Sequence, residues 1–390
     1  MNILFYAWGS HNDPATINEL NSRPDVNIVL YTKKVADFHA DSIFAMEFME
    51  LIHSNSFDIV FSYNYFPIIS MICEINNLPY VSWMLDCPLR TTYSKTITND
   101  CNYLFNFDKL FNARLISLGA KHCYHMPLGG FEFFEGSNIP VRDSSGKFAC
   151  DISFVGKLYN EKKYPFRQAE FSEYTKGYLD GIINAQEKIY GYNFIREVLS
   201  EDLVSEIASK CNLDLGDMFI APLRDLASDT LGTEVSARER EDALFALASD
   251  MDVDLYTKST IPDSLKLPGL HFRGTVDYER EMPYVFRDSK INLNITSKTI
   301  ESGISLRVLD IMFCGGFCMT NYQPEIAEFF EDGADLVMYS SIEDLKSKVS
   351  YYLEHEQERA QIALNGYKKV KQNHSLGKAI DSVLKTIGKL

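Results

Sequence analysis

The stretch over 301–314, ESGISLRVLDIMFC, places small polar residues directly before an apolar helix. Ser302, Gly303 and Ser305 would bring hydroxyls and unpaired backbone N–H groups together at the helix start. The amino end of a helix carries partial positive charge and binds phosphates readily. We therefore predict a diphosphate site there, and Leu306, the first apolar residue of the helix, belongs to it.

Two charged residues follow within this helix. Arg307 offers a planar fork of donors suited to a diphosphate, and Asp310 lies three residues on, where its carboxylate could accept two ribose hydroxyls. The alternative is an Arg–Asp pair on a solvated face. The surrounding residues are apolar nearly all round, which predicts a buried helix, and buried charges require partners.

Asp86 directly follows the apolar run 79–85, at the expected carboxyl end of a buried strand. Open parallel sheets expose functional groups at this end of their strands. The neighbouring Trp83 and Met84 suggest an apolar setting in which Asp86 could act as a general base. The alternative is a cap that stabilises the turn before Pro88.

His11 lies in WGSHND, the segment between the first expected strand and the first expected helix. An imidazole there could bind a substrate hydroxyl, transfer a proton or contact a phosphate. A loop histidine without such a role is the alternative. The segment lacks the G-x-G-x-x-G pattern, so the sequence has no fingerprint for a nicotinamide or flavin dinucleotide here.

Two further strands end in glycine next to a basic residue. Gly156 and Lys157 follow one strand, and Arg273 and Gly274 close another. Glycine permits close backbone approach, and a basic side chain can neutralise a phosphate or lie beside a nucleotide. The alternative is that both cations are merely solvated.

The elements that must position these residues alternate between strands and helices over the first 130 residues or so, which predicts a parallel sheet covered on both faces. Asp13 and Pro14 open the first helix as N-cap and first helical residue. We expect strands over 2–8, 26–32, 57–64, 79–85, 101–107 and 122–129, and helices over 13–23, 42–55, 66–77 and 108–120.

A linker rich in Gly, Pro, Ser and Asp over 131–148 separates this part from a second strand–helix alternation. A mainly helical insertion over about 165–245 interrupts the second alternation. We expect its strands over 150–155, 253–257, 270–274, 291–296, 317–321 and 334–340, a helix over 305–316, and helix throughout 342–390. The predicted domains are 1–147, 148–372 and a C-terminal helix over 373–390 that packs back toward the first domain.

Bulk composition excludes several classes of protein. The 390 residues carry a formal net charge of −16, and both the first 150 residues and the remainder are acidic, which argues against nucleic acid as a partner. We find neither a bilayer-spanning run nor a signal peptide and expect a cytoplasmic protein. The scattered cysteines indicate reduced thiols, and we interpret the HCYH and CGGFC segments as packing rather than metal sites.

The segment 305–370 resembles the C-terminal domain of group 1 glycosyltransferases of GT-B fold. More narrowly, it resembles the branch of that group that is related to spore-maturation proteins. That branch reads R-x-x-E-x-x-x-C/A-G-G, which RVLDIMFCGG resembles. FVGKLYNEKK resembles the strand that opens the same domain, and SWMLDCP resembles an aromatic-x-x-D-x-P element of the first domain. The resemblance does not extend to the helical insertion.

The resemblance implies two doubly wound Rossmann-like domains facing a central cleft and a hexosyltransferase that uses a nucleotide diphosphate sugar, with UDP favoured and without a bound metal. The second domain would hold the donor, with Arg307 at the diphosphate and Asp310 at the ribose. His11 and Asp86 of the first domain would face a glycan or protein acceptor, in bacterial glycan biosynthesis or protein glycosylation. A homodimer is compatible with this reading.

One departure concerns stereochemistry. Retaining relatives carry E-x7-E, whose second acid corresponds to Asp310, whereas the first position is Ser302 and Glu301 lies one residue off. The resemblance favours retention slightly, and Asp86 is the better base if the reaction inverts. Two other functions stay open: a non-catalytic nucleotide-sugar-binding scaffold, and a nucleotide-sugar epimerase that needs no acceptor.

Overall fold

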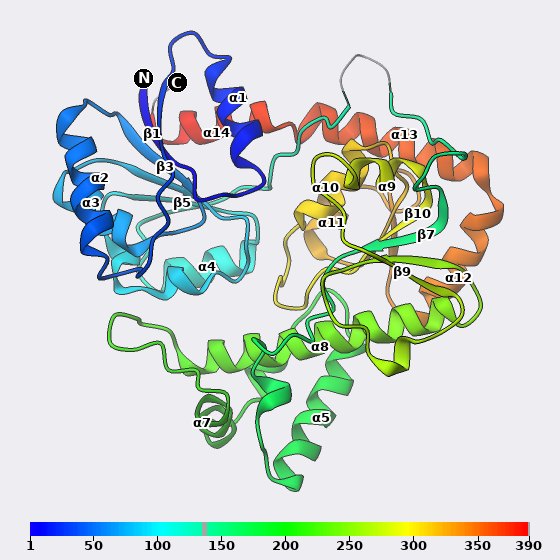
Figure 1. Cartoon of the computed structure of the whole chain (residues 1–390). Helices are drawn as coiled ribbons and strands as arrows, with labels where there is room; N and C mark the ends of the chain where they lie inside the picture. Colours follow the sequence, from blue (N-terminus) through cyan, green and yellow to red (C-terminus); the bar gives the residue numbers. More distant parts are fainter. Residues whose placement is uncertain (135–138, 389–390) are drawn as a thin grey trace. The chain divides into compact units, whose positions relative to one another are not determined.

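The computed structural model describes residues 1–134 and 139–388, and these form two compact units (Figure 1). The first unit comprises Met1–Gly129, Leu215–Ala221 and Ser375–Leu390, and the second comprises Gly130–Asp214 and Pro222–His374. Residues 135–138 of the predicted linker lie outside the described residues. Leu215–Ala221, which the sequence assigns to the helical insertion, therefore clusters with the first unit.

The first unit is built on a six-stranded sheet with the order β2-β1-β3-β4-β5-β6, in which every neighbouring pair is parallel. The central strands are buried along their whole length because helices cover both faces, and this explains their continuous apolar and aromatic runs. The strands are β1 Asn2–Tyr6, β2 Asn27–Tyr31, β3 Ile59–Tyr63, β4 Tyr80–Trp83, β5 Asn102–Asn106 and β6 His122–His125.

The first four helices of the first unit begin at capping side chains or prolines. Asp41 and Asp108 accept hydrogen bonds from Phe44 N and Phe111 N, three residues on, and so satisfy first-turn N–H groups. The helices are α1 Asp13–Asn21, α2 Ser42–Ser54, α3 Pro67–Ile75, α4 Lys109–Ser117 and α14 Leu376–Thr386, with 3₁₀ turns η1 Arg90–Tyr93 and η2 Lys95–Thr98. Arg23, next to α1, pairs with Asp381 of α14 at 2.6 Å.

The second unit repeats this design. Its six-stranded sheet has the order β12-β11-β10-β7-β8-β9, again parallel throughout, so the strand order reverses between β7 and β10. Ligands of doubly wound sheets bind at such a reversal, outside the carboxyl ends of the strands. The strands are β7 Cys150–Val155, β8 Val253–Tyr256, β9 Leu270–Gly274, β10 Ser289–Asn294, β11 Cys318–Asn321 and β12 Val337–Tyr339.

Four helices between β7 and β8 form the insertion, in which α5, α6 and α7 pack against the long helix α8 (Figure 1). The carboxyl-terminal part of α8 contributes Leu244 and Leu247 to the core of the second unit. The helices of this unit are α5 Glu173–Glu187, α6 Ile195–Val198, α7 Glu201–Lys210, α8 Leu223–Ala248, α9 Met282–Asp288, α10 Leu306–Phe313, α11 Pro324–Phe329, α12 Ile342–Glu354 and α13 Glu356–Asn373, with 3₁₀ turns η3 Phe166–Gln168 and η4 Asp263–Leu265.

Helix α10 ends where two glycines meet close backbone. Gly315 has φ +69°, a left-handed conformation that favours glycine, and a Cβ on Gly316 would lie 2.5 Å from the carbonyl oxygen of Phe286. The helix is therefore short, and it packs tightly against β10 and α9.

The predicted fold class, two doubly wound α/β units with a helical insertion in the second, is confirmed. One prediction is wrong: the segment 342–390 is not helical throughout. Helices α12, α13 and α14 are interrupted at His355 and at His374–Ser375. His355 departs from helical backbone at φ −104° and ψ 66°, and Ser375 has the extended backbone of an N-cap.

Candidate functional site

The amino end of α10 follows β10 through the loop 295–305, which leaves the sheet of the second unit at the carboxyl end of that strand. Ser305 is its N-cap with extended backbone, and within the described part of the chain its side chain makes no capping hydrogen bond to the helix. The first-turn N–H groups of such a helix favour an anionic ligand. The loop before it is tied to the neighbouring strand β11, because Thr296 N donates to Asn321 Oδ1 at 2.8 Å.

Ser302 and Gly303 are buried in this loop rather than open to a ligand. The Ser302 hydroxyl donates to Glu325 Oε1 at 2.7 Å, and Ser302 is 5% exposed. Ser305, Leu306 and Arg307, in contrast, are partly exposed. The structure therefore gives Ser302 a positioning contact with α11, and the accessible part of the predicted site starts at Ser305.

Arg307 and Asp310 form a connected group with Tyr278 from the β9–α9 segment. Arg307 Nη1 lies 3.3 Å from Asp310 Oδ2, and Tyr278 Oη donates to Asp310 Oδ1 at 2.9 Å. Burial raises the pKa of the Asp310 carboxyl to about 6, although Arg307 and Tyr278 oppose the shift. The pair is thus half buried rather than solvated: Asp310 is 2% exposed and the Arg307 side chain 29%.

The Arg307 guanidinium also contacts α9. Its Nη1 is directed at the Met282 sulfur, and its centre lies 5.3 Å from the centroid of the Phe286 ring. An arginine held over an aromatic face with one edge exposed is preorganised to meet an anion.

Gly156 and Lys157 lie on the same edge, at the end of β7. Gly156 N donates to Tyr256 O at 3.0 Å, and the Lys157 side chain is exposed. The backbone carbonyl of Lys157 accepts a 2.5 Å hydrogen bond from Arg240 Nη1. Lys157 can therefore reach a ligand while its backbone is fixed.

Arg240 of α8 is a positioning residue that the sequence does not reveal. Its Nη2 donates to Ile295 O at 2.5 Å, and its guanidinium lies 4.4 Å from the centroid of the Tyr159 ring. Arg240 thereby connects the loops after β7 and β10, the two strands at the reversal of strand order. Neither carbonyl partner is near Arg240 in sequence, so no local pattern could have identified it.

Arg273 does not join this group through its side chain. Its Nε lies 3.0 Å from Asp254 Oδ2 on the adjacent strand β8, so the guanidinium already has a carboxylate partner. Gly274 adopts φ +77°, and its carbonyl accepts from Thr257 N at 2.7 Å, which fixes the end of β9. Gly274 thus lies at the carboxyl end of the sheet, whereas the half-exposed Arg273 side chain is held by Asp254 of β8.

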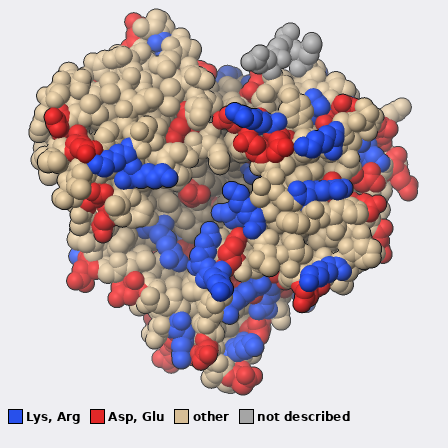
Figure 2. Space-filling model, in the orientation of Figure 1, with Lys and Arg blue, Asp and Glu red and all other residues tan. Residues whose placement is uncertain are grey.

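Basic side chains pair with acidic ones at several other places on the protein surface. Figure 2 shows basic and acidic side chains next to one another over much of the visible face. In the second unit, Lys147 lies 3.4 Å from Glu281 and Lys346 lies 2.7 Å from Asp250.

In the first unit, the loops after β1, β3 and β4 bring His11, Asn64 and Asp86 to one edge of the sheet, because these strands are parallel. Asn64 Nδ2 donates to Asp86 Oδ2 at 2.8 Å, and Asn64 Oδ1 accepts from Leu85 N and Asp86 N at 3.0 and 3.3 Å. Asn64 has φ +59°, a conformation that asparagine tolerates. Asn64 therefore fixes the orientation of the Asp86 carboxylate.

The prediction that Asp86 lies in an apolar setting is wrong. Trp83 and Met84 are buried, but β4 ends at Trp83 and the chain leaves the sheet, so Asp86 is exposed. An exposed carboxylate held by one amide can still contact a substrate hydroxyl.

The predicted N-cap role of Asp13 is also wrong. Asn12 is the N-cap position, and Asp13, as the first helical residue, accepts hydrogen bonds from Gly9 N at 3.1 Å and Ser10 N at 2.9 Å. Burial raises the pKa of the Asp13 carboxyl to about 6. Asp13 thus folds back to hold the loop that carries the exposed His11.

Three further properties bear on the type of site. All eight cysteines are free thiols. In the described ranges, no three or more His, Cys, Asp and Glu side chains are grouped so as to hold a metal ion. None of the described helices has the length and apolar character needed to cross a membrane.

Comparisons with known proteins agree with this architecture. Residues 238–385 match a family model described as glycosyl transferase-like. The fold is similar to that of Anabaena Alr3699/HepE in complex with UDP-glucose, with a TM-score of 0.57, 11% identity and full coverage of both chains. It is also similar to a glycosyltransferase from Rickettsia africae, with a TM-score of 0.54, 10% identity and coverage of 100% of this chain and 99% of the other.

A third similar structure is sucrose-phosphate synthase from Thermosynechococcus elongatus, with a TM-score of 0.52, 8% identity and coverage of 100% of this chain and 99% of the other. At these identities the likeness shows the fold, and the family model covers only residues 238–385. The narrower branch related to spore-maturation proteins stays a prediction. The chain therefore has the GT-B fold, and its residues 238–385 match the glycosyl transferase-like family model.

Proposed function

We propose that this protein is a glycosyltransferase that moves a hexose from a UDP-sugar to a hydroxyl of a glycan or protein acceptor. The observation that carries the proposal is the open amino end of α10 with Arg307 and Asp310 in its first turns. A HepE structure of similar fold was solved with UDP-glucose, which supports UDP as the nucleotide and a hexose as the sugar.

The second unit is proposed to hold the donor. The first-turn N–H groups of α10 and the Arg307 guanidinium would neutralise the diphosphate, and Lys157 would add a second cation. The Asp310 carboxylate would accept the ribose hydroxyls in place of its present bond from Tyr278. Gly274 and the end of β9 would lie toward the base. These charges let us propose departure of UDP without a metal ion.

The first unit is proposed to hold the acceptor. In the reaction, the bond from the sugar C1 to the β-phosphate oxygen breaks, a bond from C1 to the acceptor oxygen forms, and UDP leaves. We favour retention, in which the departing phosphate takes the acceptor proton. If the reaction inverts, Asp86 takes that proton, with His11 as a hydrogen-bond partner of the acceptor.

A transfer assay tests this proposal. Wild-type protein would be incubated with radiolabelled UDP-glucose, UDP-galactose or UDP-N-acetylglucosamine and a bacterial extract, and label would be counted in the glycan and protein fractions. We expect incorporation from one donor. The anomeric configuration of the product, measured by NMR, separates retention from inversion. Conversion of the donor into an isomeric nucleotide sugar without acceptor would overturn the proposal in favour of an epimerase.

The variant Asp86→Asn tests whether Asp86 of the first unit acts as the general base. With an inverted product, we expect transfer to fall roughly 10²- to 10⁴-fold, because general base catalysis contributes about that much. Affinity for UDP should stay within about twofold of wild type, since Asp86 belongs to the other unit. Unchanged transfer by Asp86→Asn with an inverted product would exclude Asp86 as the base.

A further inference from the structure

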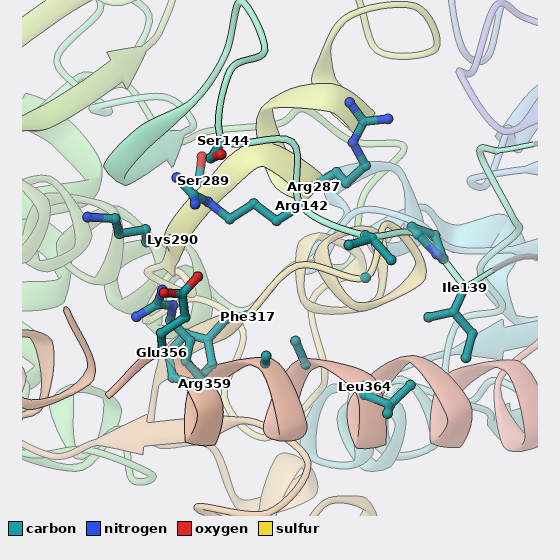
Figure 3. A pocket seen from close by; sticks show the side chains of 15 residues that line it. Ile139, Arg142, Ser144, Arg287, Ser289, Lys290, Phe317, Glu356, Arg359 and Leu364 are labelled. Carbon is teal, nitrogen blue, oxygen red and sulfur yellow. The ribbon is translucent and has the colours of Figure 1, made fainter. Parts of the chain in front are cut away.

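The second unit contains a cavity of about 440 Å³ that the proposed transfer reaction does not use. It lies at the amino ends of β10 and β11, between the segment 139–144 that precedes β7 and helix α13 (Figure 3). The donor loops lie at the carboxyl ends of the same parallel strands. The cavity is therefore on the opposite edge of this sheet, and its volume falls in the range of small-molecule sites.

Arg359 of α13 brings a buried charge to this cavity. It is 4% exposed, and its Nη1 donates to Tyr352 O near the end of α12. No carboxylate of the described residues lies within ion-pair distance of it, although a buried guanidinium ordinarily has such a partner. Burial is the main cause that lowers the pKa of Arg359. The charges of Glu356 and Asp151 oppose this shift, and the like charge of Arg142 adds to it.

Arg142 is a second lining cation without a carboxylate partner among the described residues. Its Nε donates to the backbone oxygen of Asp288 at 2.9 Å, and the side chain extends over the cavity in Figure 3. The segment carrying it is held independently, because Asp143 N donates to Asp288 Oδ1 at 3.1 Å. Two guanidinium groups that repel each other thus line one cavity.

The other charges at the cavity are already compensated. Arg287 pairs with Asp288 at 2.6 Å, and Lys290 pairs with Asp151 at 2.7 Å. Glu356, the one acidic lining residue, is exposed. Four basic residues and one acidic residue thus line the cavity, and Arg142 and Arg359 are the lining cations without an ion pair among the described residues.

The remaining wall is largely apolar. Phe317, Ala363 and Leu364 line it, together with Pro140 and the exposed Val141. Such a wall favours a ligand with an apolar body, because burying apolar surface is favourable. An inorganic ion alone would leave this wall exposed to water.

We propose that this cavity binds a small organic anion, with a carboxylate or phosphate between Arg142 and Arg359 and an apolar body against Phe317 and Leu364. The ligand supplies an ion-pair partner for two guanidinium groups that have none among the described residues. Because the cavity opens on the edge away from the donor loops, this ligand binds together with the nucleotide.

Calorimetric titration of the full-length protein tests the proposal, with UDP present at saturating concentration. Phenyl phosphate and benzoate are the probes, and inorganic phosphate and phenol supply the charge and the apolar body separately. We expect at least one organic anion to bind about tenfold or more tightly than either control, because both parts of the cavity contribute. Equal binding of phenol would overturn the proposal, as would the absence of binding by both organic anions.

Variants locate the binding. Arg142→Gln should weaken binding about tenfold or more, since charge-assisted hydrogen bonds are lost, and Arg142→Lys should restore part of it. Ala360→Trp, on the exposed face of α13, fills the cavity with both guanidinium groups intact and should abolish binding. Lys346→Gln, which removes an equal charge on α12, is the matched control and should bind as wild type.

Near-UV circular dichroism would confirm that each variant is folded. If Arg142→Gln were misfolded, Ala360→Trp would decide the question. Unchanged binding by the folded variants, or displacement of the anion by UDP, would place the probe elsewhere and overturn the proposal.

Discussion

Arg307 and Asp310, one turn apart on α10, form an ion pair in which only the arginine is accessible: the Arg307 side chain is 29% exposed and that of Asp310 is 3% exposed. The acid is buried beneath the cation and receives a second hydrogen bond from Tyr278. This arrangement holds the guanidinium beside the open first turn of α10. A structural pair that served only packing would not need an accessible arginine at a helix start.

The burial of Asp310 makes a prediction about pH. Its pKa is raised from 3.8 to about 6 in the folded protein, so the neutral form is favoured by folding. This contribution to stability is present below pH 3.8 and is lost as the pH rises through about 6. Asp310→Asn lacks this titration, and its free energy of unfolding relative to wild type should therefore increase from pH 4 to pH 6.

Urea unfolding of both proteins at several pH values measures the difference. The increase should be at most about 1.4 kcal/mol per pH unit and should level off above pH 7. Asp13 and other groups titrate in both proteins, so their effect cancels in the comparison. A difference between variant and wild type that is independent of pH would contradict the assigned burial of the Asp310 charge.

Asp13 makes a separate prediction about the first unit. Asp13→Ala removes the acceptor for Gly9 N and Ser10 N and should destabilise the protein by about 1–3 kcal/mol. Asp13→Asn keeps a side-chain oxygen and should cost less. Amide hydrogen exchange at Gly9 and Ser10 should accelerate in Asp13→Ala and much less in Asp13→Asn. Exchange at wild-type rates in both variants would show that another contact holds the His11 loop.

The prediction for Asn64 concerns the orientation of the Asp86 carboxylate. Asn64→Gly tolerates the left-handed backbone at φ +59° but loses the amide that holds the Asp86 carboxylate and its backbone N–H. If the product is inverted, so that Asp86 is the base, we expect transfer activity to fall about tenfold or more. UDP affinity should stay unchanged, because only the first unit is altered. Asn64→Asp, which places two carboxylates together, should be at least as impaired. Full activity of Asn64→Gly with an inverted product would show that Asn64 is not needed to orient the Asp86 carboxylate.

The sequence predicted the alternation of elements well, because each buried strand is a compact apolar run bounded by turn residues. The strand over 270–274, for example, has the predicted bounds. Within the candidate site, the only contacts that the sequence could predict are those between residues close together in the chain. Arg307 and Asp310 share a helix turn, so their proximity followed from helical geometry.

Contacts between distant segments could not be predicted. Tyr278 and Arg240 reach the site from other elements, and their partners are set by tertiary packing. The exposure of Asp86 was missed for a related reason: the apolar run 79–85 does not show that β4 ends at Trp83 and that the chain then leaves the sheet. Local patterns describe what a segment can form, whereas the point at which it leaves the sheet depends on its neighbours.

The central claim is that the first turns of α10 bind a nucleoside diphosphate through Arg307. Thermal unfolding with UDP, GDP, CDP, ADP and dTDP tests it most directly, for wild type, Arg307→Ala and the control Lys346→Ala, each relative to its own ligand-free Tm. At about 100 times the Kd, a ligand that binds only the folded state adds about 2.7 kcal/mol of stability. The account predicts that UDP stabilises wild type and Lys346→Ala but not Arg307→Ala. Equal stabilisation of Arg307→Ala, or no stabilisation of wild type by any of the five, would contradict it.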